Sequence, residues 1–277
     1  MIHNFISLLK HDVFEGVFHK WKYFLVAVLF FSFVDFVFIN NANSLFIAYN
    51  VDLKCSISDL LLNMFIGNEP FEPEIKKGVS LSVTWFFSHS LLFSFIGFYI
   101  TDDLKKNATS FILRVKSKKQ WWTSKCVWCV LTVIIYYTLF FIIALIFAAF
   151  FGTFSFSTSN LIASELFEID ISGVDVFDII FTSLLLPMII SVSIAFFEAV
   201  LNLILKPVYA FLIVIYYLAA SAFYCSEYLL FNFSMVIRND FYGVNGVTNQ
   251  YGVLIAVCLV VACYLIGAVF IKRKDIL

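Results

Sequence analysis

DDLKKNATSFILRVKSKKQWWTSK, residues 102–125, is the only long polar and basic interval between the strongly apolar segments of this chain. It holds seven of the eighteen Lys and Arg residues. Phe111, Ile112 and Val115 recur in it at helical spacing, and Trp121-Trp122 marks the start of the next apolar run. We predict a short cytoplasmic helix followed by an interfacial elbow, where a partner outside the membrane could push on the membrane part.

The composition around this interval is that of an integral membrane protein. Hydrophobic residues make up 62% of the 277 and charged residues 13%, with a mean hydropathy of +0.96. A soluble domain averages about 45–50% apolar and about 25% charged residues. The net charge of −1 gives no reason to expect a nucleic-acid partner. With 36 Phe and 10 Gly, the chain favours a bundle packed by large side chains over GxxxG contacts.

Six apolar segments come close to the ~20 residues that cross the ~30 Å hydrocarbon core of a bilayer. The fourth and fifth are separated only by Lys206-Pro207, and the chain must turn back there, with proline in the first turn of the new helix. We therefore predict an all-α integral membrane protein, a single domain over 1–277 with six transmembrane helices. The segments are 23–39, 81–100, 126–151, 177–205, 208–230 and 252–271.

Residues 1–21 precede the first span and predict an amphipathic helix along the membrane face. Its apolar residues recur every three to four positions, whereas its charged and histidine residues lie off that stripe. The apolar set is Ile2, Phe5, Ile6, Leu9, Val13 and Val17, and the polar set is Lys10, His11, Asp12, Glu15 and His19.

The Lys and Arg distribution predicts that both termini are cytoplasmic. With the N-terminus inside, the inner segments hold fourteen of these residues and the outer segments four, which accounts for all eighteen. The outer segment 230–251 is aromatic but half polar, which favours short extracellular re-entrant or interfacial helices between spans five and six over an ordinary loop.

The six cysteines predict packing rather than chemistry. Cys126 and Cys129 form a C-x-x-C at the start of a predicted span, with no further metal ligands nearby, and a buried thiol there behaves as a small hydrophobe. A Cys55–Cys225 disulfide is an alternative, because both residues fall on the predicted outer side.

Three features together resemble the membrane subunits of ABC-2 type ABC exporters. They are the six-span plan with an amphipathic N-terminal helix and both ends inside, the basic and aromatic segment 111–125, and the ending FIKRKDI at 270–276. The resemblance implies that 102–125 couples the chain to an ATPase. Phe111 would fill a groove on that partner and Arg114 would make charge-assisted contacts at its edge. The full set of ATPase-coupling candidates is Lys106, Asn107, Ser110, Phe111 and Arg114.

The alternative for this segment is a basic loop that obeys the positive-inside rule and has no partner. Such loops rarely contain buried-type residues such as Phe111, Ile112 and Val115, so we favour coupling. The chain lacks a G-x-x-x-x-G-K-[ST] phosphate loop, and we expect it to bind no cofactor itself. A separate ABC ATPase subunit would carry ATP and Mg, and a second permease subunit, identical or homologous, would complete the pathway.

Four polar residues within the predicted spans are candidates for the substrate pathway: Asp35, His89, Glu198 and Asn202. Ionisable groups at such depth are costly and usually face a cavity or a partner. The alternative is interhelical hydrogen bonding that fixes the packing, which applies above all to His89. An intramembrane enzyme is disfavoured because no H-E-x-x-H, no paired carboxylates and no Gly-rich nucleophile turn are found.

The expected function is therefore that of a non-enzymatic permease subunit in the cytoplasmic membrane of a bacterium. It would move an amphipathic or hydrophobic substrate such as a peptide, a lipid or a drug. One hypothesis is export of antimicrobial peptides or immunity to them. The alternatives are a secondary transporter or channel, for which inverted repeats with broken helices would be expected, and a non-transporting membrane scaffold.

Overall fold

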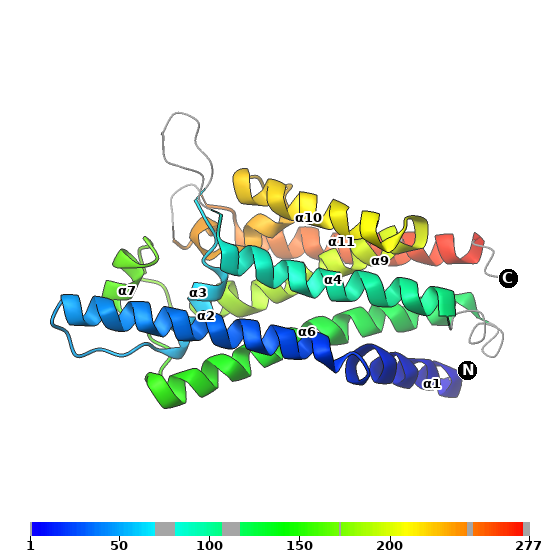
Figure 1. The fold of residues 1–277 in the computed structure, drawn as a ribbon. Coiled ribbons are helices and arrows are strands. Elements are labelled where there is room, and N and C mark those ends of the chain that lie inside the picture. Colours follow the sequence, from blue (N-terminus) through cyan, green and yellow to red (C-terminus); the bar gives the residue numbers. More distant parts are fainter. Residues whose placement is uncertain (1, 70–80, 107–116, 172, 243–245, 274–277) are drawn as a thin grey trace.

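The computed structural model describes residues 2–69, 81–106, 117–171, 173–242 and 246–273 (Figure 1). Within these ranges the chain is helical, and its two β-bridges are isolated ones that build no strand. Five helices are long and apolar enough to cross a membrane, by length and composition. The chain is accordingly a multi-pass helical membrane protein, as predicted. The long helices are α2 (Trp21–Ala48), α4 (Val83–Lys106), α6 (Lys118–Phe151), the continuous run Val176–Ile204 and α11 (Asn249–Arg273).

The predicted fifth span is shorter than the others. Helix α10 (Pro207–Phe223) has 17 residues, at the lower limit of what crosses a bilayer, and the predicted end at residue 230 lies seven residues beyond it. The turn at Lys206-Pro207 is confirmed, because α9 (Leu186–Ile204) ends just before it and Pro207 opens α10. The first and third spans extend past the predicted limits, to Ala48 and back to Lys118.

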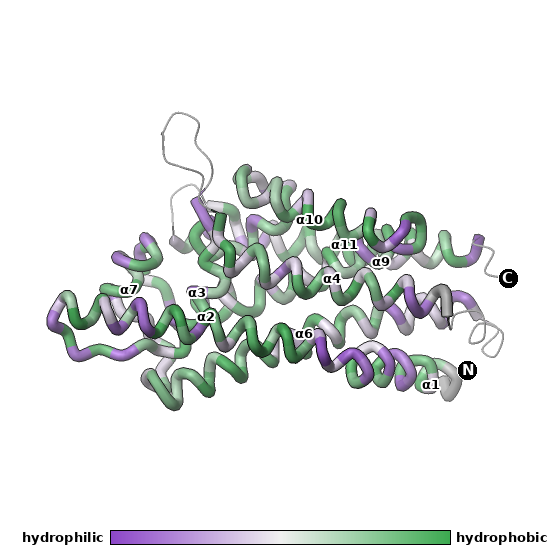
Figure 2. The backbone as a smooth tube through the Cα atoms, viewed as in Figure 1, coloured by the Kyte–Doolittle hydropathy of each residue, from purple (hydrophilic) through white to green (hydrophobic). Residues whose placement is uncertain are grey.

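Two ends of the bundle can be distinguished in Figure 1. At the terminal end lie α1 (Ile2–Val13), the last turn of α4, the start of α6 and the end of α11. The far end carries the short elements α3 (Ile57–Phe65) and α7 (Asn160–Glu165). Figure 2 shows hydrophobic residues along the lengths of the long helices, with hydrophilic ones concentrated toward these two ends.

The far end is closed by buried helical turns. Helix α3 buries every side chain except that of Asn63, and the segment predicted to re-enter forms two 3₁₀ helices, η3 (Leu230–Ser234) and η4 (Val236–Arg238). Trp85 of α4 donates through Nε1 to the Ser234 hydroxyl at 2.9 Å. Phe231 and Phe233 of η3 are therefore core side chains of the cap, whereas Phe241 is exposed.

Arg238 ties the cap to the end of α10. Its guanidinium is buried and donates to backbone carbonyls of the last turn of α10 and of the chain after α3, as well as to the Asn232 side chain. The C-terminal end of a helix carries partial negative charge, so a cation is favourable there. The oxygen acceptors belong to Asn68, Glu69, Ser221, Ala222, Tyr224 and Asn232.

Asp59 makes the stability of the cap depend on pH. It closes a capping box with Ser56, and burial raises the pKa of its carboxyl from 3.8 to about 6, against the opposing effect of the Ser56 hydrogen bonds. Because the folded protein holds this proton more tightly, the contribution is full below pH ~4 and is lost as pH rises through about 6. We expect the free energy of unfolding to fall by up to ~3 kcal/mol over this window.

Thermal unfolding in detergent micelles from pH 4 to pH 7 measures this effect. Asp59→Asn should remove that part of the pH dependence, whereas Asp52→Asn, at an exposed position, should leave the profile unchanged. A profile that keeps the same slope in Asp59→Asn would contradict the assignment.

The fourth span starts with a widened turn. Helix α8 (Val176–Ile180) continues through the π-helical turn η2 (Phe181–Leu185) into α9, and Pro187 follows directly, in the first turn of α9. The hydroxyls of Thr182 and Ser183 donate to backbone carbonyls one turn earlier, at 2.8 and 2.6 Å. A proline has no N–H to donate, so it is accommodated where the helical hydrogen-bond pattern is already interrupted.

Candidate functional site

Three charged side chains from three helices meet at the terminal end of the bundle. Asp12 of α1, Asp103 of α4 and Lys125 of α6 form a group that we call the ionic cluster. The Lys125 amino group contacts Asp12 Oδ1 and lies 2.6 Å from Asp103 Oδ2. Their side chains are at most 2% exposed. The cluster is therefore a buried link between α1 and the two long helices.

Polar and aromatic neighbours satisfy both carboxylates. Asp12 accepts from the Ser124 hydroxyl at 2.6 Å and from the Tyr99 hydroxyl at 3.1 Å. Asp103 accepts from Trp121 Nε1 at 3.2 Å. The Lys125 nitrogen also lies 5.0 Å from the centre of the Tyr99 ring and 5.4 Å from that of Trp121, within range of cation–π attraction. Desolvated charges are tolerated in a protein when they are paired and hydrogen-bonded in this way.

Two further contacts between basic and acidic side chains lie at this end. His11 Nε2 lies 3.7 Å from Asp103 Oδ1, and Lys20 pairs with the partly exposed Asp102 at 3.6 Å. Gly16 brings the turn after α1 close to α6, because a Cβ there would collide with the Trp128 and Tyr99 rings. Close approach and ion pairing thus hold the N-terminal helix against the bundle at the same place.

The cluster corrects the prediction for the N-terminal helix. Asp12 belongs to the face expected to be polar and to lie away from the apolar stripe, yet it is 1% exposed, whereas Ile6 of the stripe is 45% exposed. The side that packs on the bundle carries Leu8 and Asp12 of α1 and Gly16 of the turn that follows, at a spacing of four residues. That spacing is the signal in the sequence, whereas Lys125, the partner of Asp12, ends the basic interval 102–125 and is not distinguished there from the other cations.

The predicted coupling residues fall next to the cluster along the chain. Asp103 lies three residues before the end of α4, and Lys125 is the eighth residue of α6. The ionic cluster therefore ties together the two helices that flank the coupling segment. Asn107, Ser110, Phe111 and Arg114 lie outside the described residues, as does the side chain of Lys106.

Glu198 and Asn202 form a second polar group, within the spans. The Glu198 side chain is fully buried, and neither carboxylate oxygen has a hydrogen-bond partner among the described residues. One oxygen occupies the space that Gly97 of α4 leaves open. Asn202 donates to the Glu198 carbonyl at 2.9 Å and accepts from Thr101 at 3.0 Å. The group connects α9 with α4, and it contains two of the four predicted pathway candidates, Glu198 and Asn202.

The other two candidates lie apart from that pair. His89 is eight residues from Gly97 on α4, roughly 12 Å along the helix. Its Nδ1 lies 2.8 Å from the Trp85 carbonyl. Four aromatic rings surround its imidazole, those of Phe65, Trp85, Phe93 and Phe231. These contacts fit the packing interpretation of His89.

Asp35 is buried within α2, and its carboxylate has no hydrogen-bond partner among the described residues. A lone carboxyl group at such depth is costly in a bilayer and usually serves a pathway or a partner. Across the part of the chain that the structure describes, no three His, Cys, Asp or Glu residues come together as metal ligands.

All six cysteines are free thiols, so the Cys55–Cys225 disulfide is not formed in this structure. Cys126 and Cys129 are buried, as expected of packing residues, and Cys225 and Cys258 are exposed.

Comparison with known proteins places the chain in a family without assigning it an activity. A family described as protein of unknown function (DUF2705) matches residues 71–277, about three quarters of the sequence, and the chain belongs to it. Asp103, Lys125, His89 and Glu198 lie in the matched part, and Asp12 precedes it. No curated protein and no solved structure matches the chain.

Proposed function

We propose that this member of the DUF2705 family is the permease subunit of an ATP-driven transporter of the ABC-2 exporter type. A separate ABC ATPase subunit would bind ATP and Mg, and a second permease subunit, identical or homologous, would complete the pathway. The substrate would be amphipathic or hydrophobic, a peptide, lipid or drug, with antimicrobial-peptide export or immunity as one case. The site would be the cytoplasmic membrane of a bacterium, with both termini and residues 102–125 on the cytoplasmic side.

The observation that carries the proposal is the ionic cluster. A segment that receives a push from an ATPase can move the spans only if the helices at its two ends are firmly held. Asp103 and Lys125 sit at those two ends and are joined to each other and to Asp12. A displacement of the segment would then pass to α4, α6 and α1 as one unit, because packed elements shift between discrete arrangements rather than deform.

The path of the chain supports six crossings. Helices α9 and α11 both run from the far end toward the terminal end, and α10 must bring the chain back between them (Figure 1). Its 17 residues extend about 26 Å, against ~30 Å of hydrocarbon. The carboxyl groups of Asp35 and Glu198, which have no hydrogen-bond partner within the described part of the chain, are the proposed polar lining of the pathway.

Phe111→Asp tests the proposal. When the permease is purified together with the products of its neighbouring genes, an ATPase subunit should co-purify with it. Phe111→Asp should lower both the amount of co-purified ATPase and the ATP turnover at least tenfold. The reason is that a buried aromatic anchor contributes about 2 kcal/mol or more to an interface. The matched control is Phe154→Asp, which introduces the same charge at an exposed position at the far end.

Failure of any ATPase to co-purify, together with unchanged transport and ATP turnover in Phe111→Asp, would overturn the exporter assignment. The second candidate would then be a proton-coupled transporter, which the buried carboxyl groups of Asp35 and Glu198 favour. In that case Glu198→Gln should abolish uptake or efflux driven by a proton gradient in vesicles that contain no ATP.

A further inference from the structure

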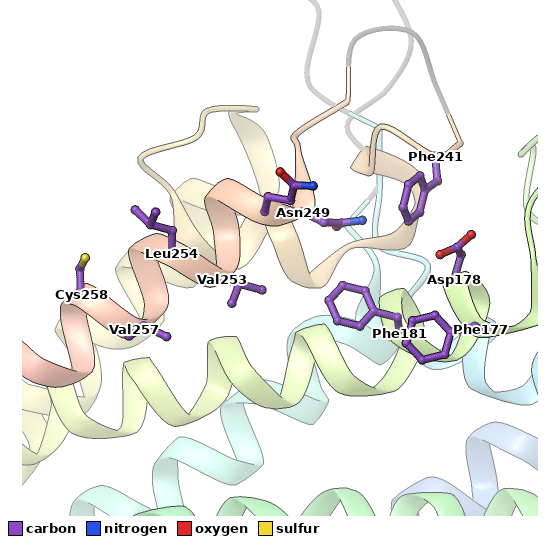
Figure 3. A pocket seen from close by; sticks show the side chains of 10 residues that line it. Phe177, Asp178, Phe181, Phe241, Asn249, Val253, Leu254, Val257 and Cys258 are labelled. Atoms are coloured by element: carbon purple, nitrogen blue, oxygen red, sulfur yellow. The ribbon is translucent and has the colours of Figure 1, made fainter.

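An apolar groove of about 620 Å³ runs along the outside of the bundle at the far end, between the start of the fourth span and α11 (Figure 3). Its apolar part is lined by Phe177, Phe181, Val253, Leu254, Val257 and Cys258. Its polar end is lined by Asp178, Asn249 and Gln250. We call it the far-end groove. None of the candidate pathway residues lines it, so it is separate from the site described above.

The length of the groove along α11 matches the thickness of one leaflet of a bilayer. Asn249 is the first residue of α11, and Cys258 lies nine residues further along the same helix. At 1.5 Å per residue this is about 14 Å, close to half of the ~30 Å hydrocarbon core. The polar end therefore lies where the span begins, and the apolar length runs inward from it.

The acidic side chain of Asp178 at the polar end favours a ligand with a positively charged group. Asp178 is half-buried, and no basic side chain among the described residues forms an ion pair with it. The preceding segment 152–176 contains four acidic residues and no Lys or Arg. Asn249 already donates to the Asn239 side chain at 3.0 Å. Asp178 carries the only acidic or basic side chain among the described residues that line the groove.

The wall of the groove is held in shape by the widened turn η2. Thr182 and Tyr242 are joined through their hydroxyls at 3.1 Å, which fixes the chain that carries Phe241 above the polar end (Figure 3). Phe177 and Phe181 stack along one wall, with ring centres 6.2 Å apart. Single π-helical turns are frequent at functional sites, where they redirect side chains. A preformed groove binds a ligand without the cost of ordering its own wall.

We propose that the far-end groove binds one membrane lipid whose head group carries a primary amine. The ammonium group pairs with Asp178, and an acyl chain lies along the apolar length beside Leu254 and Val257. A lipid fits better than a helix of a second copy, because the groove follows only ten residues, Asn249 to Cys258, of a 25-residue helix. Its volume lies within the ~300–1,000 Å³ typical of ligand sites.

Native mass spectrometry of the full chain tests the proposal. The protein is released from bilayers that contain equal amounts of phosphatidylethanolamine and phosphatidylglycerol with identical acyl chains. We expect one retained lipid and a preference of roughly fivefold for phosphatidylethanolamine, the upper range for a partly exposed ion pair. Asp178→Asn should abolish the preference. Asp175→Asn, an exposed acid three residues earlier that does not line the groove, should keep it.

A second variant tests the apolar part. Leu254 is 60% exposed, so Leu254→Trp should fill the groove without lowering the unfolding temperature, and it should reduce retention of both lipids. Equal retention of the two lipids by the wild type, or an unchanged preference in Asp178→Asn, would overturn the proposal. The proposal would also be overturned if the wild type formed a dimer without bound lipid and Leu254→Trp dissociated that dimer. This result would assign the groove to a second copy of the chain.

Discussion

Lys125→Met is expected to destabilise the protein by about 3–5 kcal/mol, the range found when one partner of a buried ion pair is removed. The substitution keeps most of the apolar stem of the side chain but removes the charge between Asp12 and Asp103. Two buried carboxylates would then face each other without a cation. Either they take up protons or α1 separates from the bundle, and both outcomes cost folding free energy.

The measurement is unfolding in detergent micelles followed by the fluorescence of the five tryptophans, one of which, Trp121, contacts the cluster. Lys119→Met is the matched control. It removes an exposed Lys six residues earlier in the same helix and should change stability by less than about 0.5 kcal/mol.

Removal of all three charges separates charge pairing from packing. A triple variant, Asp12→Asn, Asp103→Asn and Lys125→Met, leaves no unpaired ion and should recover most of the lost stability, as replacement of whole buried ion pairs often does. Equal destabilisation in the single and triple variants would show that the packing of the Lys125 side chain matters rather than its charge. An unaffected Lys125→Met protein would exclude the cluster as a rigid link.

Arg238→Met is expected to have a comparable effect at the opposite end, about 3–5 kcal/mol, since each buried acceptor left unpaired costs about 1–3 kcal/mol. The five N–H groups of the guanidinium are shared among six oxygen atoms, including the Ser221 and Ala222 carbonyls in the last turn of α10. Burial lowers the pKa of Arg238 to about 10, which still leaves it charged at neutral pH. Methionine would leave these buried acceptors without donors, at the full cost of their desolvation.

Arg273→Met provides the control, since it removes an exposed Arg from the last turn of α11. Arg238→Lys should rescue only in part, because an ammonium group has three donors and lacks the planar fork that reaches several carbonyls. Hydrogen exchange should show faster opening of η3 and of the end of α10 in Arg238→Met, with α6 unaffected. Uniform loosening of the whole bundle would contradict the local role assigned to this residue.

The long apolar segments could be predicted from the sequence because the bilayer imposes a length. A helix must satisfy its own backbone hydrogen bonds across ~30 Å, so hydropathy alone locates the spans, and Lys206-Pro207 locates the turn between α9 and α10. The same reasoning places the end of the fifth span at residue 230, seven residues beyond the end of α10. Hydropathy cannot distinguish apolar residues of the buried cap from residues that lie in the membrane.

The candidate site could be predicted only in part. Glu198 and Asn202 lie one turn apart on α9, so their proximity follows from helical spacing. Their contact with Thr101 and Gly97 of α4 depends on how two helices pack, a matter of side-chain shape that no local pattern records. Asp35 and His89 do not join Glu198 and Asn202. Asp35 lies on α2, and His89 lies on α4 eight residues before Gly97.

By itself the sequence determined that this protein is helical, lies in a membrane and turns where proline follows lysine, because each of these depends on local composition and on the fixed thickness of a bilayer. Only the tertiary structure decided that Asp12, Asp103 and Lys125 share one buried site, and that Arg238 closes the end of α10. These contacts join residues as far apart as 113 and 170 positions, and each supplies a partner to a charged group that burial has removed from water.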